Sequence, residues 1–226
     1  MKPSDVEHLA TTVTLDDGTE LILRPIRPSD REQLAAGFTR LSTESRSMRF
    51  FSALSALNDR QLTYFTDIDY VDHFAWVAGV RTPDNSEYGV GVARYIRTSP
   101  GATDAEAAVT VIDDYHRRGI GSILLEALAA VALTNGITTF LLHVRSDNRP
   151  MASTMSDLGA RPSFSEEAGT LEYRMNLPEV ANDVRDTPMW KVFKLVGAGD
   201  ELVAGPRFDH RRGSPGDDTP SDEQPI

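Results

Sequence analysis

A basic, glycine-containing turn at residues 116–122 is the stretch of this chain with the most evident chemistry. It reads His-Arg-Arg-Gly-Ile-Gly-Ser, with glycines at Gly119 and Gly121. Glycine lets backbone N–H groups approach a ligand closely, and a helix that begins in such a turn offers unpaired amide donors and the positive end of its dipole. These features predict an anion-binding site. For these seven residues alone, an ordinary turn with a solvated basic pair is the alternative.

One carboxylate upstream of the turn, Glu106, has a sequence context that suits a general base. It lies in Ala-Glu-Ala-Ala-Val-Thr at residues 105–110, where the other side chains are small or apolar. Burial in such a strand would fit the carboxylate for base work, directly or through a water molecule. The alternative is that Glu106 lies at the frayed start of the strand and only contacts water.

The turn is predicted to join a strand to a helix. Residues 109–112 are β-branched and apolar except for Thr110, which is typical of a strand buried on both faces. The helix after Gly119 is apolar nearly all round, so we expect it to be buried, and Asn135-Gly136 ends it. Two nucleotide motifs are excluded: a Rossmann fingerprint needs glycine where Leu124 stands, and the Gly-Lys-Ser/Thr of a P-loop is absent.

This strand, turn and helix resemble the coenzyme A-binding turn of the GNAT superfamily of acyl-CoA-dependent N-acyltransferases. The family pattern is Gln/Arg-x-x-Gly-x-Gly/Ala, and this chain has His116-x-x-Gly119-x-Gly121. Backbone amides carry most of such a contact, so histidine at the first position is a mild departure. Residues 105–110 also look like the same strand in bacterial Pat-type protein lysine acetyltransferases, where the corresponding glutamate is assigned as the base. The resemblance covers residues 17–177.

The resemblance implies an enzyme that moves an acetyl group from acetyl-CoA, or another short acyl-CoA, to a primary amine. Glu106 would be the catalytic base, and without cysteine no thiol acyl-enzyme can form, so we expect direct transfer in a ternary complex. No metal is expected. A strand amide near Val111 would stabilise the oxyanion. The expected cofactor-binding residues are Val111, Ile112, His116, Arg117, Arg118, Gly119, Ile120, Gly121, Ser122 and Asn148.

Several alternatives stay open at this point. The acceptor is expected to be a protein lysine, with a small amine or a non-catalytic acyl-CoA-binding sensor as alternatives. Asn148 could equally be a loop cap. His143 is expected to be a packed strand histidine rather than a second base. The resemblance assigns residues 41–51, with Arg46 and Arg49, to the two short helices that wall the acceptor site, although the sequence favours solvated arginines over core phenylalanines.

One position departs from the family pattern in a way that affects the chemistry. Many GNAT enzymes carry a tyrosine seven residues after the loop asparagine, to protonate the leaving thiolate. Counting from Asn148 reaches Met155 here. A thiol of pKa about 8.5 can leave as its anion, so turnover does not require that acid. A domain that binds acyl-CoA without turning it over is also compatible.

The predicted elements run strand, two helices, three strands, helix, strand, helix, two strands. This order predicts one three-layer α/β domain around a mixed sheet of about seven strands. The resemblance implies helices on both faces and a splay between the fourth and fifth strands, the strand before the turn and the strand at 137–144. We expect a flexible segment over 1–16, the domain over 17–177, an extension with a short docking helix at Trp190 over 178–204, and a disordered acidic tail over 205–226.

Composition narrows the class of protein further. The 226 residues include no cysteine, which excludes disulfides and cysteine metal sites and fits a reducing cytoplasm. The net charge of −11 argues against nucleic acid as a partner. No run of 18 apolar residues occurs, so we expect neither a membrane span nor a membrane partner. We expect a cytoplasmic monomer or homodimer.

Overall fold

The structure, a computed structural model, describes residues 6–50, 54–157, 160–165 and 169–177. Within these ranges a single mixed sheet has the strand order β1-β2-β3-β4-β5-β6-β8-β7. The strands are β1 Thr11–Thr14, β2 Glu20–Pro25, β3 His73–Arg81, β4 Glu87–Arg97, β5 Asp104–Val111, β6 Thr139–Arg145, β7 Arg161–Phe164 and β8 Thr170–Asn176. Only β5 and β6 pair in parallel among these neighbours.

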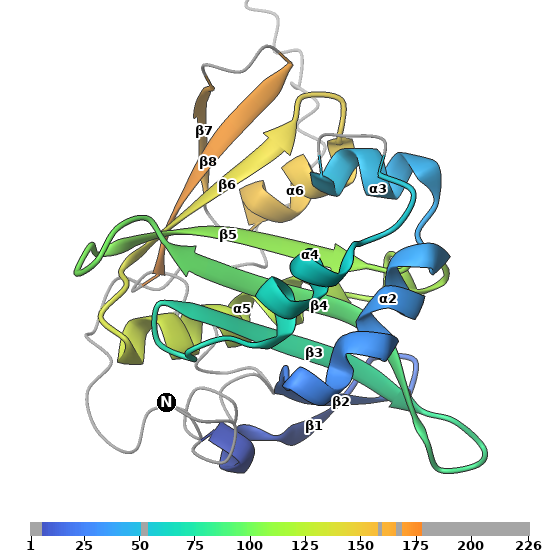
Figure 1. Cartoon of the computed structure of the whole chain (residues 1–226). Helices are drawn as coiled ribbons and strands as arrows, with labels where there is room; N and C mark the ends of the chain where they lie inside the picture. The colour runs from blue at the N-terminus through green and yellow to red at the C-terminus, as the bar shows by residue number, and fades with distance from the viewer. Residues whose placement is uncertain (1–5, 51–53, 158–159, 166–168, 178–226) are drawn as a thin grey trace, which may run out of the picture.

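Helices cover both faces of the sheet, which confirms the predicted three-layer architecture (Figure 1). The α-helices after residue 30 are α2 Arg31–Arg40, α3 Thr43–Phe50, α4 Asp59–Thr66, α5 Ile120–Thr134 and α6 Arg149–Asp157. The short 3-10 helices are η1 Glu7–Leu9, η2 Pro28–Asp30 and η3 Asp113–Tyr115. In Figure 1, α2, α3 and α4 lie in front of the sheet, and α5 lies behind it. As its apolar sequence predicted, α5 is buried and packs against β3, β4 and β5.

The packed domain begins earlier than the expected boundary at residue 17. β1 pairs antiparallel with β2, from Thr11↔Leu23 to Thr14↔Glu20. The side chains of Val6, Leu9, Val13 and Leu15 are all buried. The sequence Thr-Thr-Val-Thr offers one inward apolar residue, so the pairing partner rather than the local pattern makes it a strand. The predicted helix at Trp190 and the predicted tail lie outside the described residues.

The parallel pair β5–β6 opens into the predicted splay. Its register covers only Asp104↔Thr139, Ala105↔Phe140 and Glu106↔Leu141. β5 continues to Val111 and β6 to Arg145, but they are no longer paired there. Figure 1 shows the two strands fanning apart. One half of β5 therefore has sheet hydrogen bonds on one side only, from its antiparallel pairing with β4.

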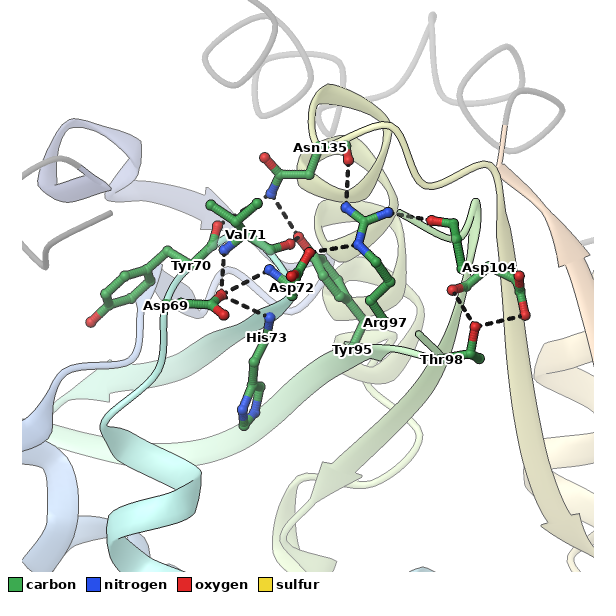
Figure 2. A network of polar contacts seen from close by, with 11 residues as sticks. Asp69, Tyr70, Val71, Asp72, His73, Tyr95, Arg97, Thr98, Asp104 and Asn135 are labelled. Atoms are coloured by element: carbon green, nitrogen blue, oxygen red, sulfur yellow. Dashed lines mark hydrogen bonds and ion pairs between the residues drawn. The ribbon is translucent and has the colours of Figure 1, made fainter. Parts of the chain in front are cut away.

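A polar network ties the C-terminal end of α5 to β4 and to the residues just before β3. Figure 2 shows Arg97 of β4 between Asp72 and Asn135, the residue that follows α5. Its Nε lies 2.6 Å from the Asp72 carboxylate, and its Nη2 donates to the Asn135 carbonyl at 2.7 Å. The Asn135 amide in turn donates to the Tyr95 hydroxyl at 2.7 Å. In the middle of α5, Trp76 Nε1 donates to a backbone carbonyl at 3.0 Å.

Candidate active site

A cavity of about 1280 Å³ opens where β5 and β6 diverge. Its wall combines β5, the turn after it, the first residues of α5, β6, the start of α6 and part of α3. The tertiary structure thus brings the predicted site residues together, with two exceptions, Ile112 and Arg118. A volume of this size is sufficient for a ligand larger than most drug-sized molecules.

The free edge of β5 directs backbone groups into this cavity. The Ile112 amide donates to the Val90 carbonyl at 2.9 Å, whereas Val111 lies opposite Gly91. Hydrogen-bonded and non-hydrogen-bonded pairs alternate along an antiparallel ladder. The N–H groups of Val111 and Val109 therefore point away from β4 and towards the gap. Ile112 is 5% exposed and its amide is occupied, so it is a core residue and does not support the predicted cofactor contact.

The first turn of α5 has the properties of an anion site. The first backbone bond of the helix runs from Ile123 N to Gly119 O, which leaves the amides of Ile120, Gly121 and Ser122 without a helical acceptor. The N-cap Gly119 has a left-handed φ of 77° and provides no side-chain cap, and the first turn contains no acid. A Cβ placed on Gly119 or Gly121 would meet no atom within 4 Å. The donors are thus open to an incoming anion, and the residues fit a diphosphate.

The three basic residues of the turn have different positions. Arg117 lines the cavity and adopts a left-handed φ of 59°. His116 also lines it, and its Nε2 lies 2.8 Å from the Val111 carbonyl, which joins the turn to the β5 edge. Arg118 is absent from the wall, because its guanidinium lies 4.7 Å from the Tyr115 ring centroid and 3.4 Å from the Asp17 carboxylate. The predicted cofactor contact of Arg118 is therefore not supported.

Glu106 and His143 lie on the cavity wall, on the sheet face covered by α3. Glu106 pairs with Leu141 across β5–β6, so its side chain and that of His143, two residues further along β6, point to the same face. Both side chains are exposed. The expected burial of Glu106 is wrong, because the strands separate directly beyond it. The expected packing of His143 is wrong for the same reason.

Asn148 lies on the cavity wall, whereas Met155, seven residues later, lies in the core. The Asn148 side-chain oxygen accepts from the Met151 amide at 3.2 Å and so caps α6, which confirms the loop-cap alternative. Asn148 also lines the cavity, so its remaining donor can reach a ligand. Met155 is fully buried and does not contribute to the wall. The count of seven residues from Asn148, which leads to a catalytic tyrosine in many family members, therefore leads to a core residue in this chain.

Two kinds of feature are absent from the part of the chain that the structure describes. None of the described helices is long and apolar enough to cross a membrane. Within the same residues, no group of three or more His, Cys, Asp or Glu side chains is arranged to hold a metal ion.

Comparison with known proteins agrees with the site. A model of the acetyltransferase (GNAT) domain family matches residues 20–161. Acetyltransferase Pat of Mycolicibacterium smegmatis is 36% identical over 170 residues, which are 74% of this chain and 49% of that protein. Acetyltransferase PA5475 of Pseudomonas aeruginosa is 34% identical over 146 residues, 65% of this chain and 77% of that protein. The chain thus spans about half the length of the mycobacterial relative.

A solved structure shows the same architecture. The crystal structure of the GNAT domain of S. lividans PAT has a TM-score of 0.68 and 31% sequence identity, and the match covers 75% of this chain and 97% of that domain. The strand–turn–helix, the splayed parallel pair and the extent of the family match lead to one conclusion: this chain belongs to the GNAT acetyltransferase family.

Proposed function

We propose that this chain is an N-acetyltransferase that moves an acetyl group from acetyl-CoA directly to a primary amine. Within that class we propose a protein lysine side chain as the acceptor. The observation that carries the proposal is that one cavity contains unpaired helix amides, a free strand edge and a carboxylate. The likeness to acetyltransferase Pat and to the S. lividans PAT domain supports it. The acidic chain, with a net charge of −11, also suits a cationic acceptor.

In this proposal the chain holds acetyl-CoA through two backbone features. The amides of Ile120, Gly121 and Ser122 bind the diphosphate, with Arg117 and His116 beside it. The free edge of β5 pairs with the pantetheine arm along the splay. Acetyl-CoA supplies an activated acyl group as a thioester. The N–H groups of Val109 and Val111 point into the gap, where they can stabilise the oxyanion that forms during attack.

Glu106 is the proposed general base. An incoming ammonium must lose a proton before its nitrogen can attack. The exposed Glu106 carboxylate on the cavity wall can take that proton directly or through a water molecule. His143 lies on the same face and is the nearest titratable alternative on β6. Because this chain has methionine at position 155, where many family members have a tyrosine, we infer that the thiol leaves as its anion.

The experiment follows free thiol while the protein, acetyl-CoA and a lysine peptide are incubated together. We expect Glu106→Gln to lower kcat/KM at least ~10²-fold with acetyl-CoA affinity unchanged, because the substitution removes the base and keeps the shape. Glu20→Gln, an exposed glutamate of β2 outside the cavity, is the matched control and should retain activity. Full activity in the Glu106 variant would reject its role as base.

A second candidate is a non-catalytic acyl-CoA-binding module. The departure from the family pattern favours it, since no tyrosine stands seven residues after Asn148 to protonate the leaving thiolate. Tight acetyl-CoA binding without thiol release for any amine would select this candidate.

A further inference from the structure

Two arginines lie where the cavity meets a second, smaller pocket. This pocket has a volume of about 90 Å³ and is lined largely by apolar residues, of which α2 and β4 contribute the largest share. Arg49 of α3 and Arg94 of β4 line both spaces. The sequence favoured a solvated position for Arg49, but α3 directs this residue to the cavity wall.

Arg94 is a buried cation with neutral hydrogen-bond partners. Its side chain is 6% exposed, and its Nη1 lies 3.2 Å from the Phe65 carbonyl and 3.0 Å from His73 Nε2. Its guanidinium carbon lies 4.4 Å from the Phe65 ring centroid. Burial and the charge of Arg94 lower the pKa of His73 to about 4, so this ring is neutral at pH 7. Both bonds use Nη1, although a guanidinium has five N–H donors.

The second arginine adds charge at the same place. Burial, followed by the positive charge of Arg49, lowers the pKa of Arg94 to about 9, and burial lowers that of Arg49 to about 10. Both guanidinium groups therefore stay cationic at neutral pH and repel one another. Buried charges are normally paired with an opposite charge. Arg94 has only neutral hydrogen-bond partners, and Arg49 adds a second positive charge near it on the cavity wall, so this position favours an anionic ligand.

The position of Arg94 relative to Glu106 indicates that a substrate in the cavity can reach the two arginines. Arg94 lies opposite Ala108 in the β4–β5 ladder, and Glu106 lies opposite Ile96, two residues further along. The side chains of Arg94, Ala108 and Glu106 therefore share one sheet face. Ala108 lines both spaces and is small, which leaves a path along β5 from the proposed reaction centre to the arginines.

We propose that Arg49 and Arg94 form a carboxylate subsite for a substrate bound in the cavity. This inference rests on the proposed function of the site. A carboxylate accepts two parallel N–H bonds from one guanidinium. Two arginines therefore bind a planar carboxylate better than they bind an anion that acts as a point charge. Neither an acetyl group nor a lysine side chain carries a carboxylate, so the subsite extends the proposed substrates in one of two ways. The carboxylate is the far end of a dicarboxylic acyl-CoA, or it belongs to an acceptor that carries a carboxylate as well as the amine.

The test compares two matched substrate pairs. Acetyl-CoA and succinyl-CoA differ by a carboxylate on the acyl group, and Nα-acetyl-lysine and its carboxamide differ by one on the acceptor. We expect the protein to prefer the carboxylate member of at least one pair by ~10-fold or more in kcat/KM, as a charge-assisted bond would give. The pair that shows the preference identifies the source of the carboxylate.

Variants separate the arginines from the rest of the molecule. Arg94→Met and Arg49→Gln should each remove most of the preference while the uncharged partner substrate is still used. Arg40→Met is the matched control, because Arg40 lies 4.1 Å from the Tyr88 ring centroid, outside both spaces, and should leave the preference intact. Circular dichroism checks folding, and Arg49→Gln alone suffices if the Arg94 variant does not fold.

Equal use of both members of each pair, or a preference that survives both cavity variants, would overturn the subsite. Failure of the proposed function gives a different result, namely no thiol release with any substrate. In that case equilibrium dissociation constants for the same four compounds still test the subsite, since they need no turnover. Equal affinities within both pairs would then overturn it.

Discussion

Gly121→Asp tests the first turn of α5, because it should move stability and cofactor binding in opposite directions. Gly121 is the second residue of the helix, and a side chain there would enter open space. Replacing a helical glycine by alanine stabilises the helix by about 1 kcal/mol, and aspartate is less favourable than alanine by up to roughly 0.7 kcal/mol. A carboxylate near the helix N-terminus adds about 0.3–1 kcal/mol.

The expected net stabilisation is therefore about 0.5–1.5 kcal/mol. For a domain of this size that raises Tm by roughly 1–6 °C. The same carboxylate would occupy the proposed diphosphate position. At about 5 Å and an effective dielectric constant between 20 and 80, each pair of like charges costs about 0.8–3 kcal/mol. With two diphosphate charges, even the low end weakens acetyl-CoA binding at least ~10-fold.

Thermal denaturation and calorimetric titration with acetyl-CoA measure the two effects on one sample. Gly121→Ala is the control for the loss of glycine, since it adds a methyl group and no charge. The aspartate variant should bind acetyl-CoA more weakly than the alanine variant. Wild-type affinity in the aspartate variant would show that these amides do not receive the diphosphate. A lower Tm would show that the first turn is not open as described.

Two further predictions concern stability. Burial, and then the charge of Arg94, lowers the pKa of His73 from 6.5 to about 4, so the folded state favours the neutral ring. The contribution of His73 to the free energy of unfolding is therefore fully present above pH 6.5 and falls by up to about 3 kcal/mol as the pH drops to 4. Urea denaturation at several pH values measures this loss, and His73→Gln should reduce it. Asp30 is 8% exposed and holds Arg24 at 2.7 and 2.8 Å. Asp30→Asn should lower the free energy of unfolding by about 2–4 kcal/mol, because a buried cation loses a partner. Asp59→Asn is the control: Asp59 pairs with Arg31 at the surface and its side chain is 96% exposed, so this variant should change the urea midpoint little.

The sequence by itself determined the local part of the site. Two glycines and a following apolar helix within a few residues specify an open helix N-terminus, because backbone conformation and helix formation depend mostly on neighbours along the chain. The turn, the buried helix and the strand before it could therefore be predicted. The layer architecture followed from the order of the elements and from the family resemblance.

The tertiary structure decided which side chains reach the cavity. Val111 and Ile112 are adjacent and both apolar, and only the register with β4 shows that one amide is free and the other is bonded to Val90. Glu106 is exposed because its neighbouring strand departs, which its own apolar context could not indicate. Met155 likewise looked like a site position by spacing and is in the core.

The pairing of Arg49 with Arg94 is the feature furthest from the sequence signal. The two residues lie on a helix and a strand far apart in the chain, and each alone looks like an ordinary arginine. Local patterns report which face of an element is apolar, but they carry no information on which faces of distant elements meet. Helix and strand packing in three dimensions sets that contact, so the turn was legible in the sequence and the cation pair became visible only in the fold.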